Sequence, residues 1–398
     1  MNKSFKYTCL FGGGAIRGVS YIGAVKAMEE LQIIPDTLAG SSVGSIFAAL
    51  LAVGYTAEEM KEIFFKVNFE LFKDISFGFG SAFALSKGEV FLDWVRDLIE
   101  KKFYGAEYKK GTNRAVTFRD IDKDLVVITT NLSNFECKEF SKHETPDYEI
   151  ASAIRISCCM PGLMKPIEYN KTLLVDGDLQ KSWPMWKLSK NLLKDEDRIL
   201  EFRLEGNYDN NNISGIDYAN AVYSCMTAMA TSFVTDIYAK NDKFDYVLIN
   251  TGEIVVVDFN MSKDKRNDLI NSGYAQTMEY FKNVLPEKKK TIKEGYQIVL
   301  SHIQKIQKFL NSNKIFKAKI EVGDLFISLS NFSEIIDISD ITEIKSFKDI
   351  FFSNIKYPAL FGKLKLNNSK LVNTELNRLS TKFTEKTDEL SAYLKQYG

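Results

Sequence analysis

The chain has 398 residues, 45% hydrophobic and 26% charged, which is the composition of an ordinary globular protein. Its 52 basic and 52 acidic side chains cancel, so it lacks the positive field that binding a nucleic-acid polymer requires. Two histidines exclude a histidine-rich metal centre, and five cysteines without a C-x-x-C spacing indicate neither a zinc site nor a disulfide framework. We therefore expect no metal and no cofactor.

The N-terminal part of the chain contains no pattern typical of targeting. Residues 1–7 have no long apolar core and no small-residue cleavage site, so they do not predict a secretory signal. Residues 37–57 carry no charge, but their glycines, serines and threonines make them too polar for a membrane span. We interpret them as a strand, a turn and a buried helix, and expect a cytoplasmic protein.

The first 60 residues alternate between strand and helix patterns. The β-prone run Tyr7–Phe11 ends in glycines, and apolar residues then repeat at helical spacing over residues 15–31. Thr37–Gly40 predicts a second strand, and residues 43–54 predict another helix. A strand, a glycine loop, a helix, a strand and a helix in this order predict parallel βαβ topology.

The middle of the chain predicts further helices and buried strands. Residues 58–104 are mainly helical in pattern, except for a Phe- and Gly-rich stretch at 75–83, which is either a loop under the core or a mobile apolar flap. Continuous apolar runs predict strands buried on both faces. These runs are Leu125–Thr130, Leu173–Val175, Tyr246–Asn250 and Ile254–Val257.

The composition changes near residue 281. Residues 281–320 contain ten lysines and two glutamates, whereas residues 321–344 contain six acids and no base. Apolar residues from Ile292 to Leu310 keep helical spacing, which predicts an amphipathic helix with a lysine-rich outer face. This face is either a solvated cap or a surface for anionic lipid or an acidic partner. We expect one domain over residues 1–285 and an extension over 286–398.

Gly40-Ser41-Ser42-Val43-Gly44 matches the G-x-S-x-G pattern. In this pattern a nucleophilic serine stands on a sharp turn between a strand and a helix, and the flanking glycines let neighbouring backbone pass close by. With 23 glycines in the chain, the match alone is weak. Its position between a predicted strand and a predicted helix makes Ser42 the candidate nucleophile, with Gly40 and Gly44 forming the elbow.

The glycine run Gly12–Gly18 lies between a predicted strand and a predicted helix, where backbone N–H groups suit an anion. Arg17 and Ala15 break the dinucleotide-binding spacing, and no Gly-Lys-Ser/Thr follows for a phosphate loop. The run is therefore either an oxyanion hole for acyl transfer or a tight packing turn.

Asp176-Gly177-Asp178 directly follows an apolar run, so Asp176 is expected at the carboxyl end of a buried strand. By itself this is a turn; beside a serine elbow, Asp176 becomes a candidate base. A triad requires a histidine, but His143 and His302 are expected in surface positions. A Ser42–Asp176 dyad fits the residues better.

The glycine loop, the serine elbow about 25 residues later and the downstream Asp-Gly together resemble the patatin-like phospholipases over roughly residues 5–282. Gly13–Gly18 is similar to the family's G-G-G-x-R/K-G, with Ala15 at the third glycine. Residues 151–166 resemble a further family segment. Two departures are Asp178, where the family has Gly or Ala, and Ser182 in place of an Asn. Asp178 either disturbs the pKa of Asp176 or points to solvent.

The resemblance implies a three-layer α/β sandwich with a mainly parallel sheet, and a metal-independent hydrolase of phospholipid acyl esters, of phospholipase A type. Ser42 would be the nucleophile and Asp176 its base. Gly13, Gly14 and Ala15 would hold the oxyanion, with Gly18 in the same loop. Arg17 would steady the loop or meet the lipid phosphate.

Other functions remain open. One is a lipid-binding protein without turnover. Another is a regulated bacterial effector, either a toxin or an antiviral phospholipase activated by a cyclic nucleotide or a protein. In each case the expected partner is a phospholipid membrane that the protein contacts peripherally. The oligomeric state, the head group and the acyl position are not predicted by the sequence.

Overall fold

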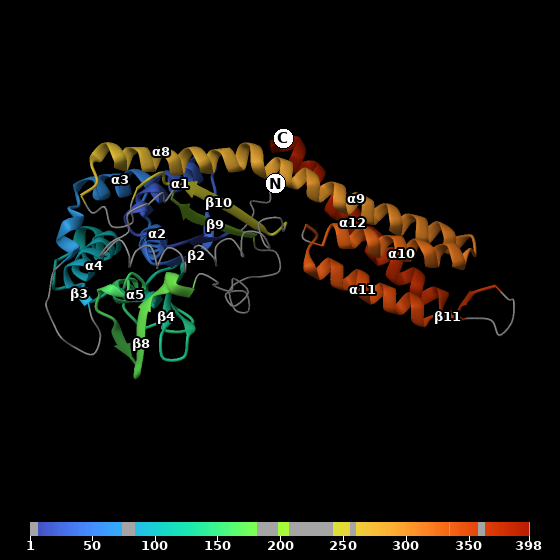
Figure 1. The fold of residues 1–398 in the computed structure, drawn as a ribbon, viewed down its shortest axis with the longest axis horizontal. Helices are drawn as coiled ribbons and strands as arrows, with labels where there is room; N and C mark the ends of the chain where they lie inside the picture. The colour runs from blue at the N-terminus through green and yellow to red at the C-terminus, as the bar shows by residue number, and fades with distance from the viewer. Residues whose placement is uncertain are drawn as a thin grey trace, which may run out of the picture. The chain divides into compact units, whose positions relative to one another are not determined.

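The structure is a computed structural model that describes residues 7–73, 84–180, 198–206, 242–254, 260–333, 335–356 and 363–397. The chain forms two compact units (Figure 1). The first, which contains the β-sheet, comprises Met1–Asp236 and Phe244–Glu279, and the second, which is mainly helical, comprises Ile237–Lys243 and Tyr280–Gly398. The change at Tyr280 lies a few residues before the expected boundary at 285.

Within the described residues, the first unit is built on an eight-stranded mixed sheet. Four neighbouring pairs are parallel and three are antiparallel, so the sheet is mostly parallel as expected. Seven strands follow one path, and β5 (Glu136–Ser141) pairs with β4 beside it. In order they are β10 (Phe244–Asn250), β9 (Arg198–Glu205), β1 (Tyr7–Phe11), β2 (Pro35–Ser41), β4 (Asp124–Asn131), β8 (Thr172–Asp176) and β7 (Ile167–Tyr169).

The strands form where the sequence is continuously apolar. All five residues of β1 are buried, and so are the six central residues of β4, because both strands are covered on both faces. The first three of the four expected apolar runs are in strands. The fourth, Ile254–Val257, lies almost wholly outside the described residues. The Phe- and Gly-rich stretch 75–83 also lies outside them, as does Ser182.

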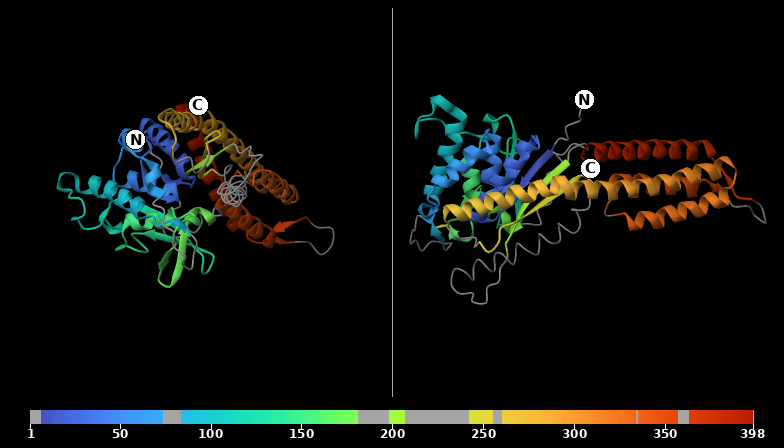
Figure 2. Two further views of the ribbon diagram at one scale, coloured as in Figure 1. Left: turned by 60° about the vertical axis from the view of Figure 1, so that its left-hand side comes forward. Right: turned by 90° about the horizontal axis from the view of Figure 1, so that it is seen from above.

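Helices flank this sheet (Figure 2). Helix α2 packs on β1, β2 and β4, and α1 packs against α8, where a Cβ on Gly23 would lie 1.8 Å from the Ile270 carbonyl oxygen. The expected single helix over 15–31 is wrong in part, because Ala15–Ser20 form a 3₁₀ helix before α1 begins. The helices are α1 (Tyr21–Glu30), α2 (Val43–Ala52), α3 (Ala57–Lys66), α4 (Glu89–Tyr104), α5 (Ile150–Ser157) and α8 (Lys263–Glu279).

The direction of β8 decides how the site is assembled. β2 pairs with β4 up to Ile128, and β8 pairs antiparallel with the next residues, Thr129–Asn131. β8 therefore continues the line of β2 from the opposite direction, and the carboxyl ends of the two strands meet. The expectation placed Asp176 at a strand end, but not on a strand that runs against its neighbour.

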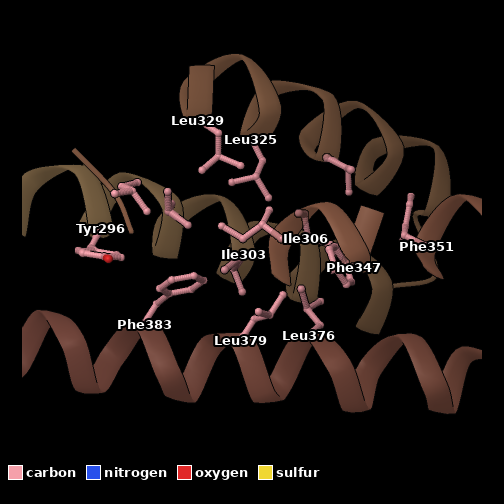
Figure 3. Packing of buried hydrophobic residues seen from close by; sticks show 14 of the residues in the cluster. Tyr296, Ile303, Ile306, Leu325, Leu329, Phe347, Phe351, Leu376, Leu379 and Phe383 are labelled. Atoms are coloured by element: carbon pink, nitrogen blue, oxygen red, sulfur yellow. The ribbon is translucent and has the colours of Figure 1, made fainter. Parts of the chain in front are cut away.

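In its described residues the second unit contains the helices α9 (Leu285–Asn311), α10 (Ile315–Asn331), α11 (Ile338–Ser353) and α12 (Ser369–Tyr397), and the short antiparallel pair of β11 (Ile355–Lys356) and β12 (Lys365–Leu366). Figure 3 shows their shared apolar core, to which α9 contributes Tyr296, Ile303 and Ile306. These residues belong to the predicted amphipathic pattern, which is confirmed. No helix in the described part of the chain is both long and apolar enough to cross a membrane.

Two polar residues of α9 differ from expectation. Lys289 is not on the outer face: it is buried, and its Nζ lies 2.5 Å from the Asp242 carboxylate. It stands three residues before Ile292, so it shares the apolar face of the helix. His302 is not a surface residue either, since only 13% of its side chain is exposed.

Candidate active site

Ser42 occupies a sharp turn between β2 and α2. Its backbone has φ 50° and ψ −132°, a conformation that few residues other than glycine adopt. A Cβ on Gly40 would lie 2.4 Å from the Gly44 carbonyl oxygen, and one on Gly44 would lie 2.0 Å from that of Phe11. Both elbow positions therefore require glycine, and the serine side chain leaves the sheet at its carboxyl edge.

The Ser42 hydroxyl donates a hydrogen bond of 2.8 Å from Oγ to Oδ2 of Asp176. Asp176 is fully buried, and its other oxygen, Oδ1, accepts the backbone N–H of Asp178 at 2.8 Å. One carboxylate oxygen of Asp176 is thus bound by the backbone, and the other accepts the Ser42 hydroxyl. This arrangement allows direct transfer of the serine proton to the carboxylate.

Ser157, which the sequence does not predict as part of the site, holds the elbow through hydrogen bonds to the backbone. Its Oγ accepts the Ser42 backbone N–H at 2.9 Å and donates to the Ile128 carbonyl oxygen at 2.5 Å. Ser45 bonds the other side of the same residue, with its Oγ 2.6 Å from the Ser42 carbonyl oxygen. Ser157 lies within the segment 151–166 that resembles the family, but only the fold brings it to the elbow.

The glycine loop lies beside the dyad and is fixed by several bonds. Gly12 N–H donates to the Phe202 carbonyl oxygen at 3.0 Å, and Gly13 N–H donates to Oδ1 of Asp178 at 3.2 Å. Arg17 is buried, and its Nε donates a hydrogen bond of 3.3 Å to the Gly14 carbonyl oxygen. Within the described residues, the N–H groups of Gly14 and Ala15 have no acceptor.

Gly18 and Gly177 let the motifs approach each other. A Cβ on Gly18 would lie 2.4 Å from Cγ2 of Val43, the first residue of α2, and one on Gly177 would lie 2.2 Å from the Ile128 carbonyl oxygen. Of the two alternatives for Asp178, the one in which it points to solvent is wrong, because its side chain is only 2% exposed. It instead bonds the glycine loop.

Both histidines are among the described residues, and neither bonds the Ser42–Asp176 pair. His143 lies at the surface, with Nε2 3.3 Å from Asp124. His302 links α9 to α10, with Nδ1 2.7 Å from Glu321 and Nε2 2.9 Å from the Ser328 hydroxyl. Glu321, His302 and Ser328 are thus connected in the order of the acid, the base and the nucleophile of a catalytic triad. However, Ser328 lies in the last turn of α10, where carbonyl groups rather than N–H groups are left over for an oxyanion.

Two thiols lie next to the dyad but do not compete with it. Burial raises the pKa of Cys159 to about 12. Burial, with a contribution from Asp176, also raises the pKa of Cys158 well above its ordinary value. Both thiols are therefore protonated near neutral pH, and a protonated thiol is a poor nucleophile.

Comparison with known proteins gives a family and a fold. Residues 10–184 match the model of the patatin-like phospholipases. The chain is 27% identical over 270 residues to an uncharacterized protein of Acanthamoeba polyphaga mimivirus, covering 66% of this chain and 89% of that one. It is 29% identical over 191 residues to a probable lipid hydrolase of Invertebrate iridescent virus 6, covering 46% and 64%.

Among solved structures, VipD from Legionella pneumophila is similar, with a TM-score of 0.51 over 97% of this chain and 90% of that one. The sequence identity is 16%, so this likeness concerns the fold.

Proposed function

We propose that the chain hydrolyses acyl ester bonds of phospholipids with a Ser42–Asp176 dyad, because residues 10–184 match the patatin-like phospholipase family. The family match and the viral lipid hydrolase support a lipid ester hydrolase. The observation that carries the dyad is the 2.8 Å bond between Ser42 and Asp176, on an elbow whose glycines tolerate no side chain.

The geometry supports a two-step reaction. Ser42 Oγ attacks the ester carbonyl carbon while its proton passes to Asp176, and the carbonyl oxygen becomes an oxyanion. When the tetrahedral intermediate collapses, the lysophospholipid leaves with the proton from Asp176 and the acyl group stays on Ser42. Water then attacks the acyl-serine, Asp176 accepts its proton, and the fatty acid is released as Ser42 regains a proton.

The oxyanion is best served by backbone N–H groups of the glycine loop. Gly13, Gly14 and Ala15 were expected as donors. Because Gly13 N–H already bonds Asp178, the N–H groups of Gly14 and Ala15 are the donors that this proposal assigns. Arg17 acts on the loop through the Gly14 carbonyl oxygen rather than on the lipid phosphate.

The proposal includes contact with a phospholipid surface, because the substrate is part of a membrane. We propose that this contact is peripheral, as expected from the sequence. An effector role and activation by a cyclic nucleotide or a protein remain expectations.

The test compares membranes incubated with wild-type protein, Ser42→Ala, Asp176→Asn and the double variant, with fatty acid and lysophospholipid measured by mass spectrometry. Each single variant is expected to lose at least about 10³-fold in rate. The double variant should lose little more, because both groups serve one proton transfer. His143→Ala is the matched control and should stay within about threefold of wild type.

Two results would contradict the proposal. Turnover that survives Ser42→Ala would exclude Ser42 as nucleophile. A wild-type protein that binds vesicles, releases no fatty acid and is not labelled at Ser42 by an organophosphorus ester would be a lipid-binding protein without turnover.

A further inference from the structure

Two buried charged residues lie directly against the glycine loop. Asp178 follows β8 and is 2% exposed, and Arg203 belongs to β9 and is 8% exposed. Arg203 Nη1 lies 3.7 Å from Oδ1 of Asp178, and its Nε donates to the Glu201 carboxylate. Although burial opposes the charge, Glu201 and Asp178 hold the pKa of Arg203 above its usual value, so the guanidinium stays charged.

Gly12 and Gly13 of the loop lie directly against these two side chains. A Cβ on Gly12 would come within 2.8 Å of Cδ of Arg203, and a Cβ on Gly13 would come within 2.5 Å of Cγ of Asp178. The first two glycines of the run are therefore explained by contact with charged side chains. They need not be explained by contact with a substrate.

Asp178 also connects the loop to the candidate base. Its carboxylate accepts the Gly13 N–H at 3.2 Å, while its own backbone N–H donates to Oδ1 of Asp176 at 2.8 Å. One residue thus bonds both the oxyanion loop and the carboxylate that is to accept the Ser42 proton. A shift of Asp178 would move the two parts of the site relative to each other.

We infer that Asp178 and Arg203 are positioning residues that fix the glycine loop relative to Asp176, and that Gly13 N–H serves this attachment. The inference rests on the proposed function. Asp178 does not cover the oxyanion donors as a group that moves away on activation, because its departure would take a carboxylate partner from the buried guanidinium of Arg203.

The test uses three full-length variants and a soluble short-chain ester. In Asp178→Ala the Gly13 N–H loses its side-chain acceptor, and a displacement of about 1 Å in a reacting group lowers rates by about 10²-fold. We expect kcat to fall by about 10²-fold with KM within about twofold. Asp178→Asn keeps an acceptor for Gly13 and should stay within about tenfold. Asp147→Ala, a change at an exposed acid, is the matched control.

A second readout does not depend on catalysis. Hydrogen exchange of peptides covering residues 12–18 should quicken at least about tenfold in Asp178→Ala and stay near wild type in Asp178→Asn. If Asp178→Ala does not fold, Gly13→Ala replaces it. Its Cβ would push the loop away from the same carboxylate, and we expect the same two effects.

The outcomes separate this inference from the proposed function. A rise in kcat in Asp178→Ala would show that Asp178 blocks the oxyanion donors. Unchanged kcat and unchanged hydrogen exchange would show that the loop does not need Asp178. Either result overturns the inference. Equal losses in the Ala and Asn variants also overturn it, because the acceptor would then not matter. A wild type without ester turnover, combined with faster loop exchange in Asp178→Ala, would refute the proposed function and leave the positioning role standing.

Discussion

Replacing Ser157 by alanine tests how the elbow is held. The hydroxyl of Ser157 is buried and bonds two backbone groups, the N–H of Ser42 and the carbonyl oxygen of Ile128. Alanine fills nearly the same space but accepts no hydrogen bond. The Ser42 N–H would then be buried without an acceptor.

The expected cost follows from that donor. A buried polar group left unsatisfied costs about 1–3 kcal/mol, so we expect Ser157→Ala to lower the free energy of unfolding by about 2 kcal/mol. Ser42 also has a positive φ, and such strain persists only where the surroundings impose it. Relaxation of the elbow should therefore lower kcat as well, by at least about tenfold.

Ser45→Ala is the matched control, because Ser45 is equally buried and bonds the same residue. It donates to the Ser42 carbonyl oxygen, which still accepts the Ser45 backbone N–H at 2.9 Å after the change. We expect a loss of about 1 kcal/mol or less. Urea unfolding and ester hydrolysis measure both variants. Equal destabilisation by the two changes would refute the reasoning, since the unsatisfied N–H would then carry no cost.

Two further predictions concern charge. Lys289→Glu should lower the free energy of unfolding by about 3 kcal/mol, because it breaks a buried pair and sets a second carboxylate beside Asp242, whereas Lys290→Glu on the exposed face should change it by less than about 0.5 kcal/mol. A hydrogen bond from Arg114 lowers the pKa of Asp120 from 3.8 to about 2. The ionised form is therefore favoured in the folded state, and this stability is present above about pH 4 and lost as pH falls toward 2. Urea unfolding at several pH values should show a shallower acid loss in Asp120→Asn; an unchanged slope would contradict the assignment.

The elbow and its strand could be predicted because their signals are local. Residues 35–52 contain the strand, the two glycines, Ser42 and the helix in one continuous stretch, and the structure has them in that order. The same holds for α9, where the spacing of Ile292, Tyr296 and Ile303 marks the buried face. The same spacing places Lys289 on that face, so the burial of Lys289 could also have been predicted from the sequence.

Contacts between distant segments could not be predicted in this way. Ser157 lies 115 residues from Ser42. Arg203 reaches the glycine loop from β9, and Asp178 reaches it from the turn after β8. An apolar run such as Leu173–Val175 predicts a strand but not its direction, because burial on both faces looks the same in a parallel and an antiparallel strand. The burial of His302 could not be predicted for a related reason, because its partners Glu321 and Ser328 are on the next helix.

Because β2 and β8 meet end to end, the candidate residues Ser42 and Asp176 follow two strands that are paired to different extents. Ser42 follows a strand paired along its length on both sides, with β1 and β4. Asp176 ends a strand that, among the described residues, pairs with three residues of β4 and with the short strand β7. Segments with few ladder bonds open first when a protein fluctuates. We therefore expect the β7–β8 hairpin, which ends at the candidate base Asp176, to open before β2, which ends at the candidate nucleophile Ser42.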